Sequence, residues 1–161
     1  MKKTAIITGA SRGIGYAAAK KLGMDGCQVV LFATGEKERY KAAIDGLTQA
    51  GITWHYVRGS LDCREDRERL IRETVEKFGR IDILVNNAGI IKRCDAVDVT
   101  EADWDTVIDI NENGSSFYLS QAFAKQYIKQ QDGGKIINVA SMLSYQGGIR
   151  VPSYTASKSA I

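Results

Sequence analysis

Five short apolar runs, separated by longer amphipathic stretches, dominate the hydrophobic pattern of the chain. The runs are rich in Ile and Val, and they occupy residues 4–8, 29–33, 52–57, 81–85 and 135–139. They are continuous rather than alternating, which is typical of strands that are buried on both faces of a parallel sheet. The pattern therefore predicts five parallel strands.

The stretches between these runs have the spacing of helices. In residues 64–80 the apolar side chains form one stripe and charged residues surround it. Gly79 follows the stripe, and glycine commonly ends a helix. Repeated strand–helix–strand units with right-handed crossovers place helices on both faces of the sheet, so the sequence predicts a doubly wound α/β fold.

Composition and charge narrow the class of protein. The 161 residues are 44% hydrophobic and 25% charged, which suits one domain with a core rather than two domains. A net charge of +3, with both signs intermixed, favours neither nucleic acid nor an anionic membrane as a partner. No apolar run approaches the roughly 18 residues that a membrane span needs. Cys27, Cys63 and Cys94 have no metal-ligand spacing, so we expect a cytoplasmic protein with reduced thiols and no metal.

The last residues have the character of an unfinished helix. From Ser153 to Ile161 a helix opens, but no glycine, basic last turn or following strand ends it. We therefore expect a single domain over residues 1–161 that is incomplete at its C-terminus, as part of a longer chain.

A glycine-rich segment, Thr8 to Gly15, lies between the first strand and the first helix. Gly9 allows a sharp turn, Gly13 allows backbone to approach a pyrophosphate, and Gly15 allows the helix to pack closely on the strand. The helix N-terminus then offers free N–H groups to phosphates. The placement predicts a dinucleotide-binding site.

Three motifs in this order resemble those of the short-chain dehydrogenase/reductase family. They are the glycine loop, the segment Asn86 to Gly89, and Ser141 followed by Tyr154 and Lys158. The resemblance covers essentially the whole chain. It implies a Rossmann-like sheet, a cytoplasmic oxidoreductase that moves hydride between a nicotinamide cofactor and a small-molecule substrate, and a homo-oligomer, either a tetramer or a dimer.

The same resemblance predicts which residues bind the cofactor. They are Gly9, Ser11, Arg12, Gly13, Ile14, Gly15, Thr34, Leu61, Asn87, Ala88, Gly89, Tyr154 and Lys158. The family's usual adenine-side Asp falls on Ser60, and Asp62 is displaced by two residues, so backbone around Ser60 and Leu61 is expected to serve instead.

The end of the second strand indicates which nicotinamide cofactor is used. An acid there would take the ribose hydroxyl of NAD and repel a 2′-phosphate, but the strand ends in Ala33 and Thr34, and Glu36 follows only after Gly35. Arg12 is suited to a 2′-phosphate, although a solvated loop arginine is the alternative reading. We expect NADP(H), with NAD(H) as the alternative.

Tyr154 and Lys158 are four residues apart, so they lie on one face of a helix. A nearby ammonium stabilises phenolate and lowers the pKa of a tyrosine from its usual value near 10. The family's mechanism, carried onto these positions, makes Tyr154 the acid/base, Lys158 the group that tunes it, and Ser141 the residue that orients the substrate oxygen.

The family's fourth catalytic residue, an Asn, falls on Asn111 when counted forward from Trp104 and on Glu112 when counted back from Ser120. The segment thus holds one extra residue, near Ser115 and Ser116. An extra residue rotates an α-helix by about 100° unless a π-bulge absorbs it. We choose Asn111.

The active-site loops suggest the substrate. Residues 141–154 and 87–105 resemble the sugar-acid branch of the family. A sugar acid carries a carboxylate, which Arg150 or Arg93 can bind, while Ser141 contacts the reacting oxygen of the substrate. The glycine loop and the Ala33–Thr34 strand end look more like 3-oxoacyl-carrier-protein reductases, which gives the alternative activity. A third reading is a non-catalytic nucleotide-binding remnant, because the sequence stops after the catalytic helix begins.

Overall fold

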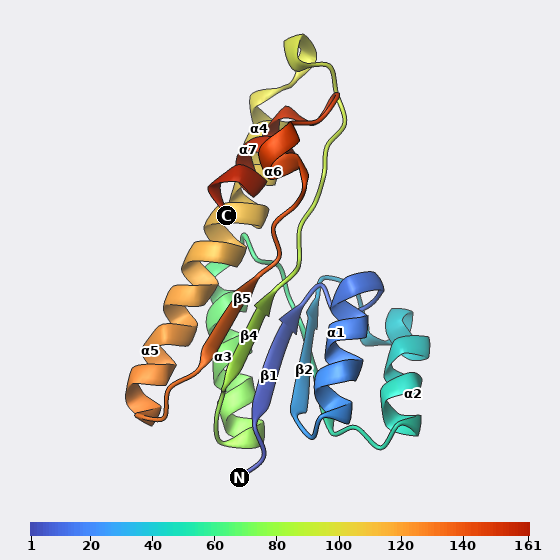
Figure 1. Ribbon diagram of the computed structural model, residues 1–161. Coiled ribbons are helices and arrows are strands. Elements are labelled where there is room, and N and C mark those ends of the chain that lie inside the picture. Colours follow the sequence, from blue (N-terminus) through green and yellow to red (C-terminus); the bar gives the residue numbers. More distant parts are fainter.

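The computed structural model describes all 161 residues and contains one five-stranded sheet (Figure 1). The strands are β1 (Thr4–Thr8), β2 (Gln28–Ala33), β3 (Trp54–Arg58), β4 (Ile83–Asn86) and β5 (Lys135–Asn138). All pairings are parallel, in the order β3-β2-β1-β4-β5. β2 and β3 follow β1 on one side of it, and β4 and β5 follow on the other side. The order of the strands therefore reverses at β1, which confirms the predicted doubly wound fold.

Helices cover both faces of this sheet. In Figure 1, α1 (Gly13–Met24) and α2 (Lys41–Gln49) lie on one face, and α3 (Arg64–Phe78) and α5 (Ser120–Gln130) lie on the other. The short helix α6 (Leu143–Gln146), with α4 (Glu101–Ile108) and α7 (Pro152–Ala160), lies beyond the carboxyl ends of β4 and β5. The remaining helical segments are the 3₁₀ turns η1 (Lys37–Tyr40) and η2 (Ala96–Asp98) and the π-helix η3 (Asp109–Leu119). None of the helices is both long and apolar enough to cross a bilayer.

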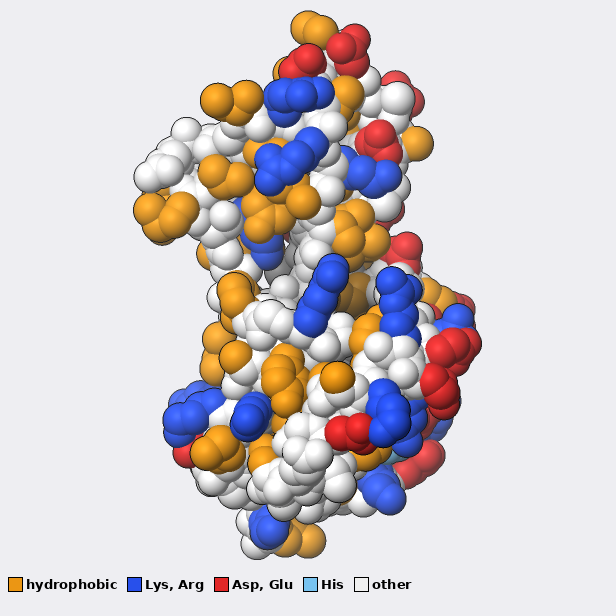
Figure 2. Space-filling model, turned by 90° about the vertical axis from the view of Figure 1, so that its right-hand side faces the viewer, with side chains coloured by type: hydrophobic (Ala, Val, Ile, Leu, Met, Phe, Trp, Pro, Cys, Tyr) orange, Lys and Arg blue, Asp and Glu red, His pale blue; other side chains and the backbone are white.

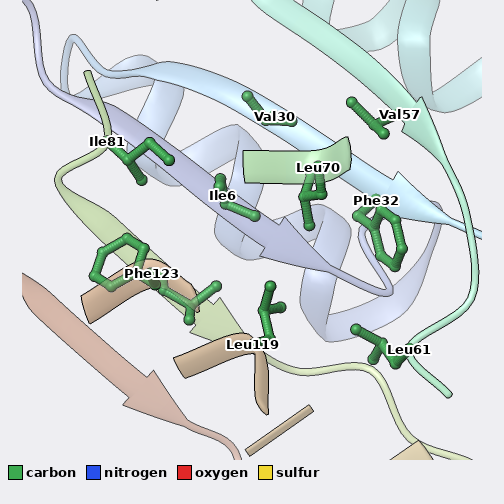
Figure 3. Close-up of a cluster of buried hydrophobic side chains, with 10 residues drawn as sticks. Ile6, Val30, Phe32, Val57, Leu61, Leu70, Ile81, Leu119 and Phe123 are labelled. Atoms are coloured by element: carbon green, nitrogen blue, oxygen red, sulfur yellow. The ribbon is translucent and has the colours of Figure 1, made fainter. Parts of the chain in front are cut away.

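Alternate residues of the central strands build two separate hydrophobic layers. Ile6 and Val30 point toward α3 and α5, where they meet Leu70 and Phe123 (Figure 3). Their neighbours in sequence point the other way and pack with side chains of α1 and α2; this second layer contains Ala5, Ile7, Ala10, Ala19, Val29, Leu31, Leu47, Ile52 and Val85. Burial on both faces explains why the central strands are continuously apolar.

Two strands begin later than the hydrophobic runs predict. Ile52 and Ile81 are buried but precede β3 and β4. At Ile81 the backbone N–H and C=O are both bound by the side-chain amide of Gln130, at 2.9 Å each, rather than by a neighbouring strand. The Ile81 side chain is therefore part of the core although its backbone is not hydrogen-bonded to a neighbouring strand of the sheet.

The prediction of burial on both faces is wrong for β5. All four of its residues are exposed, including Ile136 and Ile137. The strand lies at the edge of the sheet and pairs only with β4. Its apolar sequence resembles that of a central strand, but no helix packs closely on it, whereas α3 packs on β3 at the other edge.

Candidate functional site

A cavity of about 750 Å³ opens at the carboxyl ends of the strands, where β1 lies between β2 and β4. This is the point at which the order of the sheet reverses, the usual ligand position in doubly wound folds. Its lining is Gly9, Ser11, Arg12, Gly13, Ile14, Phe32, Ala33, Thr34, Arg39, Tyr40, Gly59, Ser60, Leu61, Asn87, Ala88, Gly89, Ile90 and Ile110. Figure 2 shows the molecule narrowed by a hollow between its upper and lower parts, with Lys or Arg side chains beside it.

The glycine loop forms one wall of this cavity. Gly9 and Gly13 both have left-handed backbone conformations, with φ of +63° and +56°, which glycine adopts without strain. Gly15 does not line the cavity; a Cβ atom there would lie 2.4 Å from the Gly9 carbonyl oxygen, so its lack of a side chain lets α1 approach the loop.

The segment that follows β4 is hydrogen-bonded to the start of this loop. Thr8 Oγ1 accepts hydrogen bonds from the backbone N–H groups of Asn87 and Ala88, each at 3.0 Å. The Asn87 side chain donates in turn to the Thr8 carbonyl at 3.0 Å. These hydrogen bonds therefore join the glycine loop and the segment after β4 into one unit beside the cavity.

The rim beside β2 carries positive charge and no carboxylate. Ala33, Thr34 and Arg12 lie there as the sequence predicts, together with Arg39 of η1, which the sequence analysis missed. Arg39 reaches the cavity because the chain forms a 3₁₀ turn after β2. In the sequence, the only indication of this role was that a basic residue follows shortly after the second strand.

On the side of β3, Ser60 and Leu61 line the cavity and Asp62 does not. The nearby carboxylate of Asp66 accepts the Ser60 backbone N–H at 2.8 Å. The residues of this wall are Gly59, Ser60 and Leu61, and none of them carries a carboxylate.

Tyr154 and Lys158 lie one turn apart on α7. The Lys158 ammonium is 5.9 Å from the centre of the Tyr154 ring and donates a 2.7 Å hydrogen bond to the Val139 carbonyl. Burial lowers the pKa of Lys158. The Lys158 side chain is thus held beside the Tyr154 ring in a poorly solvated position.

Asn111 is hydrogen-bonded to Ile90, one of the residues that line the cavity. Its side chain accepts the Ile90 N–H at 2.8 Å and donates to the Ile90 carbonyl at 3.0 Å. A Cβ atom on Gly89 would lie 3.1 Å from Asn111 Oδ1 and 3.7 Å from Lys158 Nζ. The structure therefore brings Gly89, Asn111 and Lys158 together, with Gly89 also lining the cavity.

The extra residue predicted in this segment lies within a π-helix. η3 runs from Asp109 to Leu119 and joins α4 to α5 without a break. Asn111 is fully buried, whereas Glu112 is only half-buried. The wider π turn absorbs one residue, so Asn111 faces the site while Leu119 remains in the core.

Other predicted residues lie farther from the cavity lining. Ser141 Oγ accepts the Leu143 N–H at 3.2 Å, and no hydrogen bond joins it to Tyr154. Arg150 has a left-handed backbone (φ +62°) and an ion pair with Asp95 at 3.0 Å. Arg93 is exposed. Ser141, Tyr154, Lys158, Arg150 and Arg93 are absent from the lining of the cavity.

Fold and site together define a doubly wound α/β protein with a glycine-loop cavity at the switch point of its sheet and a tyrosine–lysine pair on α7. The family model for short chain dehydrogenases matches residues 3–161, and the chain belongs to that family.

Three relatives show where the chain lies within the family. It is 46% identical to a 2-dehydro-3-deoxy-D-gluconate 5-dehydrogenase from Dickeya dadantii, over 99% of this chain and 61% of the relative. It is 34% identical to a 3-oxoacyl-(acyl-carrier-protein) reductase from Staphylococcus epidermidis, over 100% of this chain and 65% of the relative. A crystal structure from Agrobacterium tumefaciens, assigned as a 2-deoxy-D-gluconate 3-dehydrogenase with bound NADP, superposes with a TM-score of 0.82 at 38% identity, covering 98% of this chain and 61% of that one. The chain thus spans less than two thirds of the length of these relatives.

Proposed function

We propose that the protein transfers hydride between a nicotinamide cofactor and a keto or hydroxyl group of a small sugar acid, with Tyr154 as acid/base. The observation that carries this proposal is the position of the Lys158 ammonium, 5.9 Å from the Tyr154 ring and packed against the Gly89 end of the cavity. A phenol with a buried ammonium beside it is suited to proton transfer coupled to redox chemistry.

The cavity fits a dinucleotide. Backbone N–H groups at the start of α1 suit a pyrophosphate, and the basic rim at Arg12 and Arg39 suits a 2′-phosphate better than a ribose diol. We therefore propose NADP(H) as the preferred cofactor, which the NADP-bound Agrobacterium relative supports. When bound, the nicotinamide supplies or accepts the hydride.

The side chains around Tyr154 supply the proton and hold the substrate. In the reducing direction Tyr154 gives its phenolic proton to the substrate oxygen as the carbon gains hydride, and Lys158 stabilises the phenolate that remains. Ser141 donates a hydrogen bond to the same oxygen. In the oxidising direction the same groups act in reverse, and the phenolate removes the hydroxyl proton.

The substrate class rests on the relative from Dickeya dadantii and on two arginines near the catalytic helix. The Cys94 N–H binds the Arg150 carbonyl at 2.9 Å, and the Asp95–Arg150 ion pair joins the same two loops. We propose that Arg150, or Arg93 on the neighbouring loop, binds the substrate carboxylate. The 34% identical acyl-carrier-protein reductase keeps a 3-oxoacyl thioester as the alternative substrate.

One set of assays separates these functions. The protein, produced from its complete natural gene, is assayed for oxidation of 2-dehydro-3-deoxy-D-gluconate with NADP⁺ and for reduction of acetoacetyl thioester with NADPH. We expect turnover of the sugar acid, and a loss of about 10²–10⁴-fold in a folded Tyr154→Phe variant. Turnover of the thioester alone would establish the reductase alternative. Cofactor binding with no turnover of either substrate would establish a nucleotide-binding protein without catalysis.

A further inference from the structure

Glu36 is the first acidic residue after β2, in the region where an acid commonly binds the adenine ribose of NAD. It follows Thr34 by two residues, and Thr34 lines the cavity. Glu36 itself is not part of the lining. Its carboxylate forms an ion pair with the guanidinium of Arg58, the last residue of β3.

The position of Arg58 is set by the sheet and by a second hydrogen bond. Arg58 is the register partner of Ala33 in the β2–β3 ladder. Its Nε donates to the Thr34 carbonyl at 3.1 Å, while its Nη1 binds Glu36. An exposed ion pair alone contributes little, but here one guanidinium connects the end of β2 to the carboxylate that follows it.

The turn between Thr34 and Glu36 is fixed from the other side by two tyrosines. Tyr56 Oη donates to the Gly35 carbonyl at 2.5 Å and lies 3.2 Å from the Ala33 carbonyl oxygen. The Gly35 N–H donates to Tyr40 Oη at 3.1 Å, and a Cβ atom on Gly35 would lie 2.4 Å from that oxygen. These contacts restrain the backbone at Gly35. The ion pair with Arg58 therefore sets the direction of the Glu36 side chain and not the path of the backbone.

We propose that Arg58 is a positioning residue for cofactor choice, because it holds the Glu36 carboxylate away from the cavity rim. This inference rests on the proposed NADP(H) preference. With Glu36 paired, a 2′-phosphate beside Arg12 and Arg39 meets no opposing negative charge. With Glu36 released, its carboxylate repels the phosphate and is available to the hydroxyl groups of an NAD ribose.

The test compares the binding of NADPH and NADH by fluorescence titration. The proteins are the wild type, Arg58→Gln, Glu36→Gln and the double variant, and thermal melting checks that each is folded. We expect Arg58→Gln to lower the ratio of NADPH affinity to NADH affinity by about three- to tenfold. This is the effect expected when one exposed carboxylate, that of Glu36, is free to repel the phosphate. Glu36→Gln should leave the ratio near the wild-type value, and the double variant should restore it.

A matched control is Arg64→Gln, which removes the same charge from an exposed ion pair with Glu68 outside the cavity. It should leave the ratio unchanged. A double variant that stays as impaired as Arg58→Gln would overturn the proposal, since Arg58 would then act without Glu36. An equal loss for both cofactors in Arg58→Gln would also overturn it. Preference of the wild type for NADH, or binding of neither nucleotide, would overturn the proposed cofactor preference itself.

Discussion

The side-chain amide of Asn111 donates a 3.0 Å hydrogen bond to Ser157 Oγ, and both residues are fully buried. Ser157 passes this connection on, because its hydroxyl donates to the Tyr154 carbonyl at 2.9 Å. Ser157 thus connects the π-helix η3 to α7, the helix that carries Tyr154 and Lys158.

Removal of the Ser157 hydroxyl should loosen Tyr154 without changing cofactor binding. In Ser157→Ala one Asn111 N–H loses its partner, while the two contacts with Ile90 remain. We expect turnover to fall about three- to tenfold, corresponding to roughly 1 kcal/mol for one hydrogen bond. Steady-state kinetics and NADPH titration check this. Ser159→Ala, which removes an exposed hydroxyl bound to the Ser144 carbonyl, is the control and should retain turnover. Equal turnover in both variants would contradict the assigned role.

Arg39 should contribute to NADPH binding and not to NADH binding. Arg39→Gln removes one of the two guanidinium groups that line the rim near β2. Because hydrogen bonds between guanidinium and phosphate are charge-assisted, we expect NADPH to bind about tenfold more weakly. The neighbouring Lys37 lies over the Trp54 ring and outside the cavity, so Lys37→Gln should bind both cofactors normally. A parallel loss of NADH affinity in Arg39→Gln would show that Arg39 supports the fold instead.

Deletion of Ser116 should be tolerated, because a π-helix that loses one residue can close as an α-helix. Asn111 and Leu119 then keep the faces on which they lie. Deletion of Ala124, within α5, instead rotates the helix residues on one side of the deletion by about 100° relative to those on the other side. We expect a cooperative melt near the wild-type temperature for the first deletion and loss of the folded state for the second, measured by circular dichroism. If both deletions unfold the protein, the π-helix is not the element that absorbs the residue.

Asp82 should stabilise the fold above acidic pH. Burial alone raises the pKa of its carboxyl, but hydrogen bonds from Arg80 and from the Thr4 N–H outweigh burial and leave the pKa below its usual value. A carboxyl whose pKa is depressed by folding stabilises at pH values above its unfolded pKa of about 4, and this contribution is lost as the pH falls through the folded value. Asp82→Ala should therefore cost about 1–3 kcal/mol at neutral pH, and the difference should shrink below about pH 4.

Urea melts of the wild type and Asp82→Ala between pH 3 and pH 7 measure this difference. Asp132, the exposed second partner of Arg80, provides the control. Asp132→Ala should cost less than about 1 kcal/mol at any pH. A constant difference between Asp82→Ala and the wild type across the range would contradict the assignment.

The sheet, the glycine loop and the Tyr154–Lys158 pair were predictable because each is encoded within one short segment. Apolar runs, glycine spacing and an interval of four residues on a helix are local patterns. The same is true of the extra residue before Ser120, which counting detects, although counting does not decide between a rotated helix and the π-helix that the structure has.

Residues that depend on contacts between distant segments could not be predicted. Arg39 reaches the cavity through a 3₁₀ turn, Arg58 meets Glu36 through the register of β2 and β3, and Ser157 meets Asn111 across two helices. In each case the side chain is ordinary in its own segment. Its role comes from the partner that the fold supplies.

The open edge of β5 should affect how this chain behaves in solution. Its outer backbone N–H and C=O groups have no neighbouring strand, and Ile136 and Ile137 are 42% and 49% exposed. An uncovered strand edge with apolar side chains is a template for pairing with other chains. The 161-residue chain, purified alone, should therefore aggregate with rising concentration, which light scattering detects. Lys substitution at Ile137 should suppress that aggregation while leaving nucleotide binding intact.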